Sequence, residues 1–167
     1  MSTPSQAEAR FSRRDLMAAA VAVSAATGLT GVARAQQTLA GFGAPKRVDA
    51  GDLDIAYVEA GPTDGPVMIL LHGWPYDIHS FAAVMPILAS AGYRVIAPHL
   101  RGYGGTRFLS EGAMRNGQPA ALASDVIALM DALGIKMAIL GGFDWGARSA
   151  DIVAALWPER VRALVAV

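Results

Sequence analysis

No cysteine occurs among the 167 residues of this sequence. Disulfides, thiolate metal sites and cysteine nucleophiles are therefore excluded, although no compartment is, because many exported chains also lack cysteine. Charged residues make up only 17% and their formal net charge is zero, so we expect no nucleic-acid partner. The three histidines, His72, His79 and His99, lie at no metal-ligand spacing, and no glycine-rich phosphate loop with a lysine occurs. We therefore expect neither a metal nor a cofactor.

The first 35 residues have the pattern of a targeting segment. Paired arginines precede an apolar stretch over residues 16–32, and residues 33–35 supply the Ala-Arg-Ala pattern of a cleavage site. The segment resembles a twin-arginine export signal, except that Leu16 and Met17 replace the usual Phe and Lys. We expect removal of residues 1–35, export by the twin-arginine machinery, and a periplasmic or secreted mature chain without a membrane span. A retained membrane anchor is the alternative, but the stretch is shorter than the roughly 20 residues that a span needs.

Downstream of this segment, predicted strands alternate with predicted helices, and the length suits one domain. Apolar runs and alternating patterns predict strands over 46–48, 53–59, 67–71, 94–97, 136–140 and 161–167. Helical spacing and helix stops predict helices over 80–91, 120–133 and 147–156. The alternation indicates an α/β fold with a mostly parallel sheet and helices on both faces. The last strand is apolar, and we expect it to leave an unpaired edge in a core that is cut short.

Asp144 stands at the centre of the segment Gly-Phe-Asp-Trp-Gly, residues 142–146, between a predicted strand and a predicted helix. Sharp strand-to-helix turns lift the central side chain out of the sheet, and Gly142 and Gly146 would avoid clashes on either side. A carboxylate at this point suits attack on a saturated carbon, whereas a serine suits attack on an acyl carbon. The alternative is an aspartate that only caps the helix.

A second segment, His72, Gly73, Trp74 and Pro75, follows a buried predicted strand. If both turns lie at the same edge of the sheet, the backbone N–H groups of Trp74 and Trp145 converge on one oxygen. Donors arranged in this way stabilise the negative charge that develops during ester hydrolysis. The alternative is a simple turn after a strand.

A third segment, Arg-Gly-Tyr-Gly-Gly over residues 101–105, follows another predicted strand, and its alternative interpretation is a flexible linker with a solvated arginine. In this order, each at a strand end, the three segments resemble the amino-terminal half of an α/β-hydrolase over residues 48–167. The closest resemblance is to the branch of epoxide hydrolases and haloalkane dehalogenases, where His-Gly-x-Pro, Arg-Gly-x-Gly and an Asp-Trp-Gly elbow occur together. Two residues depart from this pattern. Phe143 stands where this branch commonly has His, and His99 stands where many relatives have Asp.

The resemblance implies a hydrolase in which Asp144 attacks a small-molecule epoxide and forms an alkyl ester. The Trp74 and Trp145 amides would then hold the ester oxygen. The residues that would support this site are His72, Gly73, Pro75, Gly142 and Gly146. A haloalkane dehalogenase is the alternative, in which the Trp145 indole N–H holds the leaving halide. Trp74, an aromatic residue after His-Gly, favours the epoxide.

The resemblance also implies a general base, a supporting acid and a helical cap that lie beyond residue 167. We therefore expect residues 36–167 to be the amino-terminal part of a hydrolase domain, a truncated α/β-hydrolase core. None of the three histidines is placed as the family's base is, so we expect at most one alkylation without turnover. An alternative of a different class is a non-catalytic protein, either a degenerate hydrolase or a truncated gene product.

Overall fold

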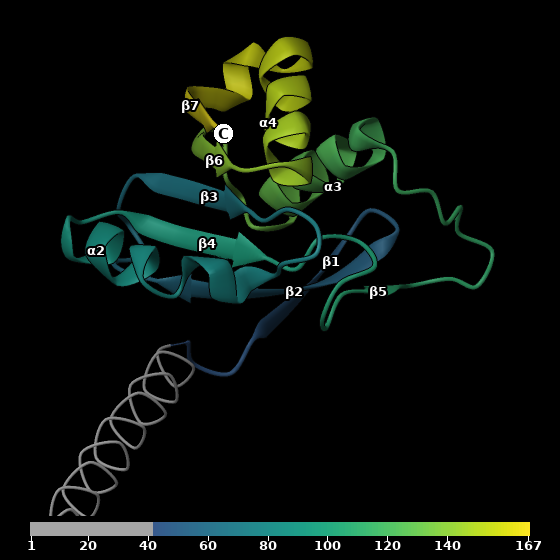
Figure 1. The fold of residues 1–167 in the computed structure, drawn as a ribbon, viewed down its shortest axis with the longest axis horizontal. Coiled ribbons are helices and arrows are strands. Elements are labelled where there is room, and N and C mark those ends of the chain that lie inside the picture. Colours follow the sequence, from purple (N-terminus) through teal and green to yellow (C-terminus); the bar gives the residue numbers. More distant parts are fainter. Residues whose placement is uncertain (1–41) are drawn as a thin grey trace, which may run out of the picture. The chain divides into compact units, whose positions relative to one another are not determined.

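The computed structural model describes residues 42–167, and the predicted export signal over residues 1–35 lies outside them. Its centre is a seven-stranded sheet in the order β1-β2-β4-β3-β6-β7, with β5 paired to β2 (Figure 1). The strands are β1 Lys46–Ala50, β2 Leu53–Ala60, β3 Val67–Leu71, β4 Arg94–Pro98, β5 Arg107–Phe108, β6 Ala138–Gly142 and β7 Val161–Ala166. The helices are η1 Ile78–Phe81, α2 Val84–Ser90, α3 Pro119–Ala132, α4 Trp145–Leu156 and η2 Pro158–Arg160.

The sheet is parallel at its centre and antiparallel at one side. Strands β4, β3, β6 and β7 pair in parallel, whereas β2 pairs antiparallel with β1, β4 and β5. Each parallel step is bridged by a helix, because a parallel neighbour can be reached only by a crossover connection. The predicted α/β class with a mostly parallel central sheet is confirmed.

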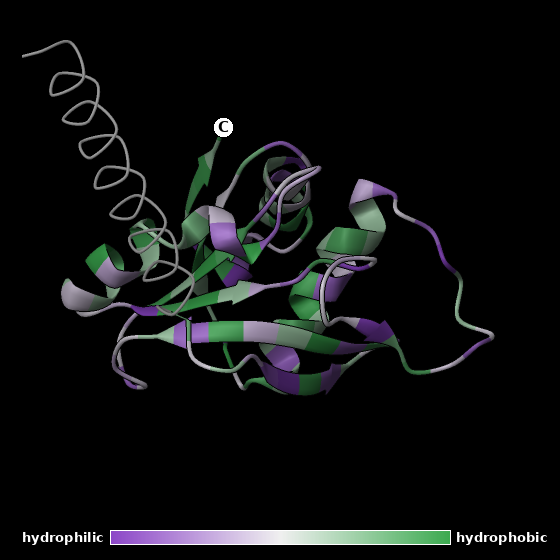
Figure 2. Cartoon of the chain, turned by 60° about the horizontal axis from the view of Figure 1, so that its bottom comes forward, coloured by the Kyte–Doolittle hydropathy of each residue, from purple (hydrophilic) through white to green (hydrophobic). Residues whose placement is uncertain are grey.

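Helices cover both faces of the central strands, as predicted. On β3, Ile69 and Leu71 pack in a core with side chains of α3 and α4, whereas Leu70 packs in a second core with η1 and α2. Successive side chains of a strand point to opposite faces, so a strand that is buried on both faces must be apolar throughout. Figure 2 shows the resulting hydrophobic strands at the centre of the sheet.

The predicted helix over residues 80–91 is wrong in its first four residues. The structure has the 3-10 turn η1 and then α2, which begins at Val84. Pro86 explains the late start, because proline lacks the N–H that a helix interior needs and is tolerated only in the first turn. The strand predicted over 136–140 also begins and ends two residues later, as β6 Ala138–Gly142. It therefore extends into the glycines, and only Phe143 and Asp144 separate it from α4.

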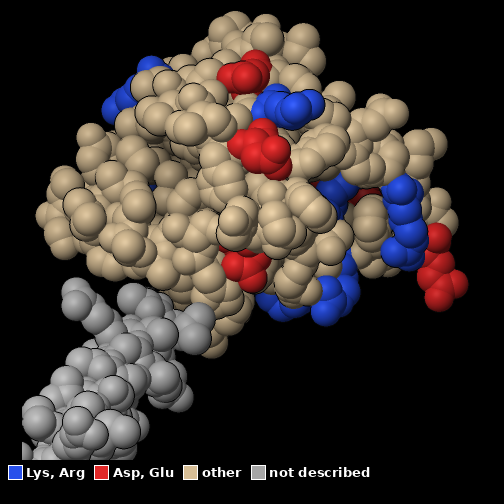
Figure 3. All heavy atoms as spheres, in the orientation of Figure 1, with Lys and Arg blue, Asp and Glu red and all other residues tan. Residues whose placement is uncertain are grey.

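Charged side chains are scattered on the face drawn in Figure 3, where neither sign forms a continuous patch. Among residues 42–167, no helix combines the length and the apolar character that a bilayer crossing requires. Within the same range, no group of three acidic or histidine side chains has the arrangement of a metal site.

Candidate active site

Asp144 occupies the tight turn between β6 and α4. Its φ of 52° and ψ of −118° make it the single non-glycine residue with positive φ in the described part of the chain. Such a conformation costs a side-chain-bearing residue about 1–3 kcal/mol and persists only where the surroundings impose it. The turn leaves the Asp144 side chain exposed at the carboxyl end of the parallel strands, the edge where open α/β sheets bind ligands.

Two glycines make this turn sterically possible. A Cβ on Gly146 would lie 2.0 Å from the carbonyl oxygen of Leu71, and a Cβ on Gly142 would lie 2.6 Å from the carbonyl carbon of Gly146. Both contacts involve backbone atoms, which cannot rotate away as a side chain can. The spacing of small residues around Asp144 therefore reflects the close approach of α4 to β3 and β6.

The segment after β3 lies directly against Asp144. The backbone N–H of Trp74 donates a hydrogen bond to Oδ1 of Asp144 at 2.9 Å, although 70 residues separate the two. A Cβ on Gly73 would lie 2.6 Å from Cβ of Asp144, so a glycine is required at this contact. Pro75 follows through a cis peptide bond. The structure thus brings together the two segments that the sequence motifs singled out.

The surroundings of Asp144 favour its ionised form. The Trp74 amide, then the Trp145 amide, and to a smaller extent Arg148, lower the pKa of the Asp144 carboxyl against the opposing effect of desolvation. Only the Trp74 amide meets the geometry of a hydrogen bond, and Asp144 makes no side-chain capping bond to α4. The Asp144 side chain therefore does not act as a simple helix cap. It is an exposed carboxylate that accepts a hydrogen bond from the Trp74 amide in the loop after β3.

His72 is fully buried and holds the loop rather than facing solvent. Its Nε2 accepts a hydrogen bond from the Leu100 amide at 3.2 Å, and its Nδ1 lies 3.2 Å from the Gly73 carbonyl oxygen. These contacts assign the neutral tautomer with the proton on Nδ1. Burial, above all, lowers the pKa of His72. His72 links the ends of β3 and β4 and fixes the backbone on which Trp74 is presented.

The Arg101 side chain is not solvated, contrary to the simpler interpretation of its glycine-rich segment. Its guanidinium makes two hydrogen bonds to the Asp125 carboxylate of α3, at 2.6 Å and 2.5 Å, and a third to the Asn116 carbonyl oxygen at 3.0 Å. Its side chain is only 9% exposed. The sequence contained a signal for this pair, because Asp125 lies on the buried stripe of α3 between Leu122 and Leu129.

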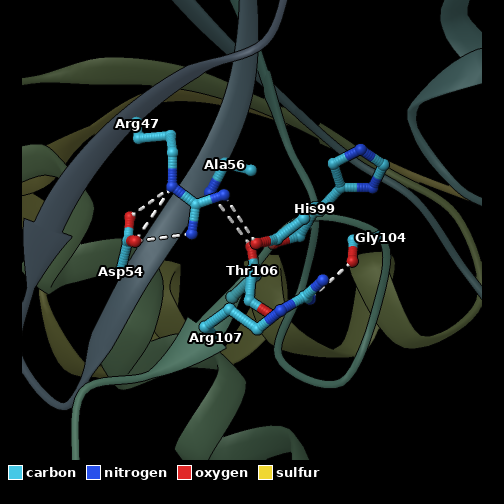
Figure 4. A network of polar contacts seen from close by, with 8 residues as sticks. Arg47, Asp54, Ala56, His99, Gly104, Thr106 and Arg107 are labelled. Carbon is cyan, nitrogen blue, oxygen red and sulfur yellow. Dashed lines mark hydrogen bonds and ion pairs between the residues drawn. The ribbon is translucent and has the colours of Figure 1, made fainter.

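His99 packs beneath the same glycine-rich loop. A Cβ on Gly104 would lie 2.2 Å from its Nδ1, which has no hydrogen-bond partner among the described residues. The His99 carbonyl oxygen accepts a 2.6 Å hydrogen bond from the Thr106 hydroxyl, which in turn accepts one from the Ala56 amide at 3.1 Å (Figure 4). His99 is thus part of the packing of the loop, and burial lowers its pKa.

Two hollows open beside Asp144. One, of about 240 Å³, lies between Trp74, Tyr103 and Trp145. Burial, followed by the charge of Asp144, raises the pKa of Tyr103, so its hydroxyl keeps its proton. The other, of about 660 Å³, has Tyr76 and Phe143 in its lining. Sequence reasoning placed neither Tyr103 nor Tyr76 at the site, because their positions depend on how the loops fold back.

Comparisons with known proteins agree with this geometry. A family model described as the alpha/beta hydrolase fold matches residues 66–167. Epoxide hydrolase A from Mycobacterium tuberculosis is 38% identical over 127 residues, 75% of this chain and 39% of that protein. Fluoroacetate dehalogenase from a Burkholderia species is 39% identical over 118 residues, 70% of this chain and 38% of that protein. A crystal structure of a presumed epoxide hydrolase from Klebsiella pneumoniae is 63% identical, with a TM-score of 0.74, over 75% of this chain and 42% of that chain.

These relatives are much longer than the matched segment. The chain spans between 38% and 42% of their lengths. The similarity therefore concerns the part of the fold that carries Asp144, the Trp74 loop and the Arg101 loop.

Proposed function

Because the chain belongs to the alpha/beta hydrolase fold family, we propose that Asp144 is the nucleophile of an epoxide-hydrolase-like reaction. The observation that carries the proposal is the Asp144 carboxylate itself, exposed on a strained turn and bonded by the Trp74 amide at 2.9 Å. An ionised carboxylate suits displacement at a saturated carbon, which an epoxide offers in a strained ring. The similarity to epoxide hydrolases supports this choice of substrate class.

In the first step, a carboxylate oxygen of Asp144 forms a bond to an epoxide carbon. The bond from that carbon to the ring oxygen breaks, and the released oxygen takes up a proton from solvent water. The product is an ester between Asp144 and the opened substrate. In the second step, a base takes a proton from water as the water oxygen attacks the carboxyl carbon, and the amides of Trp74 and Trp145 hold the negative charge on the former carbonyl oxygen. The bond from the carboxyl carbon to the alkyl oxygen then breaks, that oxygen takes up the proton, and the diol leaves Asp144 as a carboxylate.

The second step needs a general base within hydrogen-bond reach of the attacking water. Among residues 42–167, His72 and His99 are buried in loop packing, and His79 contacts Asp77 on η1. We therefore propose that residues 42–167 support the alkylation step, and that hydrolysis of the ester needs a base which these residues do not supply. Turnover belongs to a protein that also supplies the base.

Mass spectrometry tests the alkylation step directly. The chain is incubated with styrene oxide and digested, and one adduct is expected on the peptide that contains Asp144. Asp144→Asn should abolish that adduct, whereas Asp151→Asn, an exposed change on the same helix, should leave it in place. Absence of an adduct on the unmodified chain would contradict the proposal and favour a non-catalytic, ligand-binding role.

Dehalogenation is a second candidate, which the similarity to fluoroacetate dehalogenase favours. It would use the same carboxylate, with halide as the leaving group and the Trp145 indole N–H as its contact. Trp74, which presents a bulky aromatic side chain beside Asp144, is the reason we rank the epoxide first. Release of one equivalent of chloride from a chloroalkane, with no adduct from styrene oxide, would reverse this ranking.

We also propose that residues 1–35 direct export of the chain by the twin-arginine route to the periplasm or beyond. The support is the sequence pattern alone, with Arg13 and Arg14 ahead of the apolar stretch. Replacement of both arginines by lysine should retain the protein inside the cell, and cell fractionation would detect this. Continued export of that variant would contradict the twin-arginine assignment.

A further inference from the structure

The larger of the two hollows is lined by a chain neighbour of Asp144 and by a chain neighbour of Trp74. Its volume is about 660 Å³, and its lining residues are Pro75, Tyr76, Asp77, His79, Ser80 and Phe143. Phe143 directly precedes Asp144, and Pro75 directly follows Trp74, whose amide binds the Asp144 carboxylate. A substrate whose reacting carbon meets Asp144 therefore has room to place a substituent in this hollow.

Aromatic rings form one wall of the hollow. The rings of Tyr76 and Phe143 meet at 64° with their centroids 6.0 Å apart, and Phe81 supports Phe143 from the core side at 5.9 Å. Tyr76 is 60% exposed, so its ring is accessible to a ligand. The faces of aromatic rings carry partial negative charge and attract organic cations, quaternary ammonium groups above all.

A carboxylate, that of Asp77, also lines the hollow. Oδ1 of Asp77 accepts a 2.9 Å hydrogen bond from the His79 amide and lies 2.9 Å from its Nδ1. The other carboxylate oxygen has no hydrogen-bond partner among residues 42–167, and the side chain is 40% exposed. Burial alone would raise the pKa of Asp77, but the hydrogen bonds from His79 outweigh it and lower that pKa. Asp77 is therefore an ionised group with one free oxygen.

The two hollows differ in charge. No lysine or arginine lines the larger one in the described part of the chain, and Asp77 is the acidic residue of its lining. The smaller hollow includes Arg101, which is already paired with Asp125. A positively charged substituent is thus attracted to the larger hollow by the Asp77 carboxylate and by the aromatic rings of Tyr76 and Phe143, and an anionic one is repelled.

We propose that this hollow is a subsite for organic cations, and that the site prefers epoxides whose substituent carries an ammonium group. The preference for such epoxides rests on the proposed function, since it assumes that Asp144 is alkylated. The binding of a cation by Tyr76, Phe143 and Asp77 does not depend on that assumption. The two can therefore be tested separately.

The alkylation test uses two epoxides of nearly the same shape. Glycidyltrimethylammonium carries a quaternary nitrogen where 4,4-dimethyl-1,2-epoxypentane carries a quaternary carbon. Both are incubated with the 167-residue chain at pH 8, and adduct formation on the Asp144 peptide is followed by mass spectrometry. After correction for the rates with free acetate, we expect the cation to react about tenfold faster.

Asp77→Asn removes the charge while keeping an oxygen that can accept the His79 amide bond, so η1 should keep its cap. This variant should reduce the tenfold preference to about twofold or less. Asp64→Asn removes an acidic side chain from the exposed turn at the other end of β3 and serves as the matched control with unchanged preference. Circular dichroism of each variant checks that the fold is retained. Equal corrected rates for the two epoxides, or a preference that survives Asp77→Asn, would overturn the proposed selectivity while leaving Asp144 as the nucleophile.

A binding measurement covers the case in which neither epoxide reacts. Benzyltrimethylammonium is titrated into the chain with its neutral isostere, neopentylbenzene, as the reference, and NMR chemical shifts of the Tyr76 and Phe143 rings are followed. The cation should shift both rings and bind about tenfold more tightly than the isostere, and Asp77→Asn should remove that difference. Failure of alkylation with this binding intact would contradict the proposed function alone. Absence of cation binding would contradict the subsite.

Discussion

Asp144 combines three properties that depend on one another. Its positive φ exposes the side chain, the glycines around it admit the turn, and the Trp74 amide binds the carboxylate. A residue in such a conformation is stable only because its neighbours are fixed. Substitutions in the turn should therefore change the stability of the protein, and the charge of Asp144 should set the pH dependence of its alkylation.

Gly146→Ala tests the close approach of α4 to β3. Its Cβ would lie 2.0 Å from the Leu71 carbonyl oxygen, so α4 must shift. We expect the free energy of unfolding, measured by urea denaturation, to fall by about 3 kcal/mol. Gly112→Ala is the matched control, because the nearest atom to its Cβ is 3.7 Å away, and it should change stability by less than about 0.5 kcal/mol. Similar losses in both variants would show that the turn is not constrained as described.

The lowered pKa of Asp144 makes a prediction about pH. The amides of Trp74 and Trp145 favour the carboxylate, so it is protonated only at a pH below the ordinary aspartate range near 3.9. The rate of alkylation by styrene oxide should therefore be constant from about pH 5 to 8. A rate that rises through this range with an apparent pKa above 5 would mean that the amides do not stabilise the charge.

Polar contacts at strand ends, some of them buried, join elements of the structure to each other. Arg101 joins the loop after β4 to α3, and His72 joins the ends of β3 and β4. Glu59 of β2 binds Lys46 of β1 and Arg94 of β4 in the same manner. These pairs determine the positions of the joined loops and strands, because polar contacts depend on direction and hydrophobic contacts do not.

Arg101→Met tests the pair with Asp125. The variant keeps most of the side-chain volume but leaves the partly buried carboxylate without its partner. We expect a loss of about 3 kcal/mol in the free energy of unfolding, measured by urea denaturation. Arg162→Met, a change at an exposed position of β7, is the control and should cost less than about 0.5 kcal/mol. If the two variants had equal free energies of unfolding, the Arg101 contacts would not contribute to stability.

At the scale of the whole sheet, β7 is an edge strand, because within residues 42–167 it pairs only with β6. The edge strand β7 exposes Val165 by 59%, and beside it lies an entirely apolar hollow of about 330 Å³. Exposed apolar edges are surfaces on which chains associate. Figure 2 shows that the strand leading to the carboxyl end is largely hydrophobic.

Val165→Lys should reduce self-association of the chain. A charge on the exposed side of β7 must be desolvated when two such edges meet, which disfavours the contact. We expect sedimentation velocity to show a larger monomer fraction in the variant than in the unmodified chain at equal concentration. Asp151→Asn, an exposed change on α4 that raises the net charge by one unit as Val165→Lys does, controls for a general effect of net charge. An identical distribution of species in Val165→Lys would show that β7 is not the associating surface.

The sequence by itself determined the order and type of the main elements and the position of the tight turn. Apolar periodicity and glycine spacing are local properties, and they placed β3 and the segment around Asp144 correctly. The helical apolar pattern predicts a start at residue 80, whereas α2 begins at Val84 so that Pro86 falls in its first turn. The catalytic role of Asp144 stays a prediction.

Only the tertiary structure decided which distant groups meet. The bond between the Trp74 amide and Asp144 spans 70 residues, and the ion pair between Arg101 and Asp125 spans 24. The position of Asp77 in the lining of the larger hollow also depends on how η1 packs against the sheet. Such contacts follow from the registers and crossovers that bring strand ends to one edge, and no local pattern in the sequence encodes those distances.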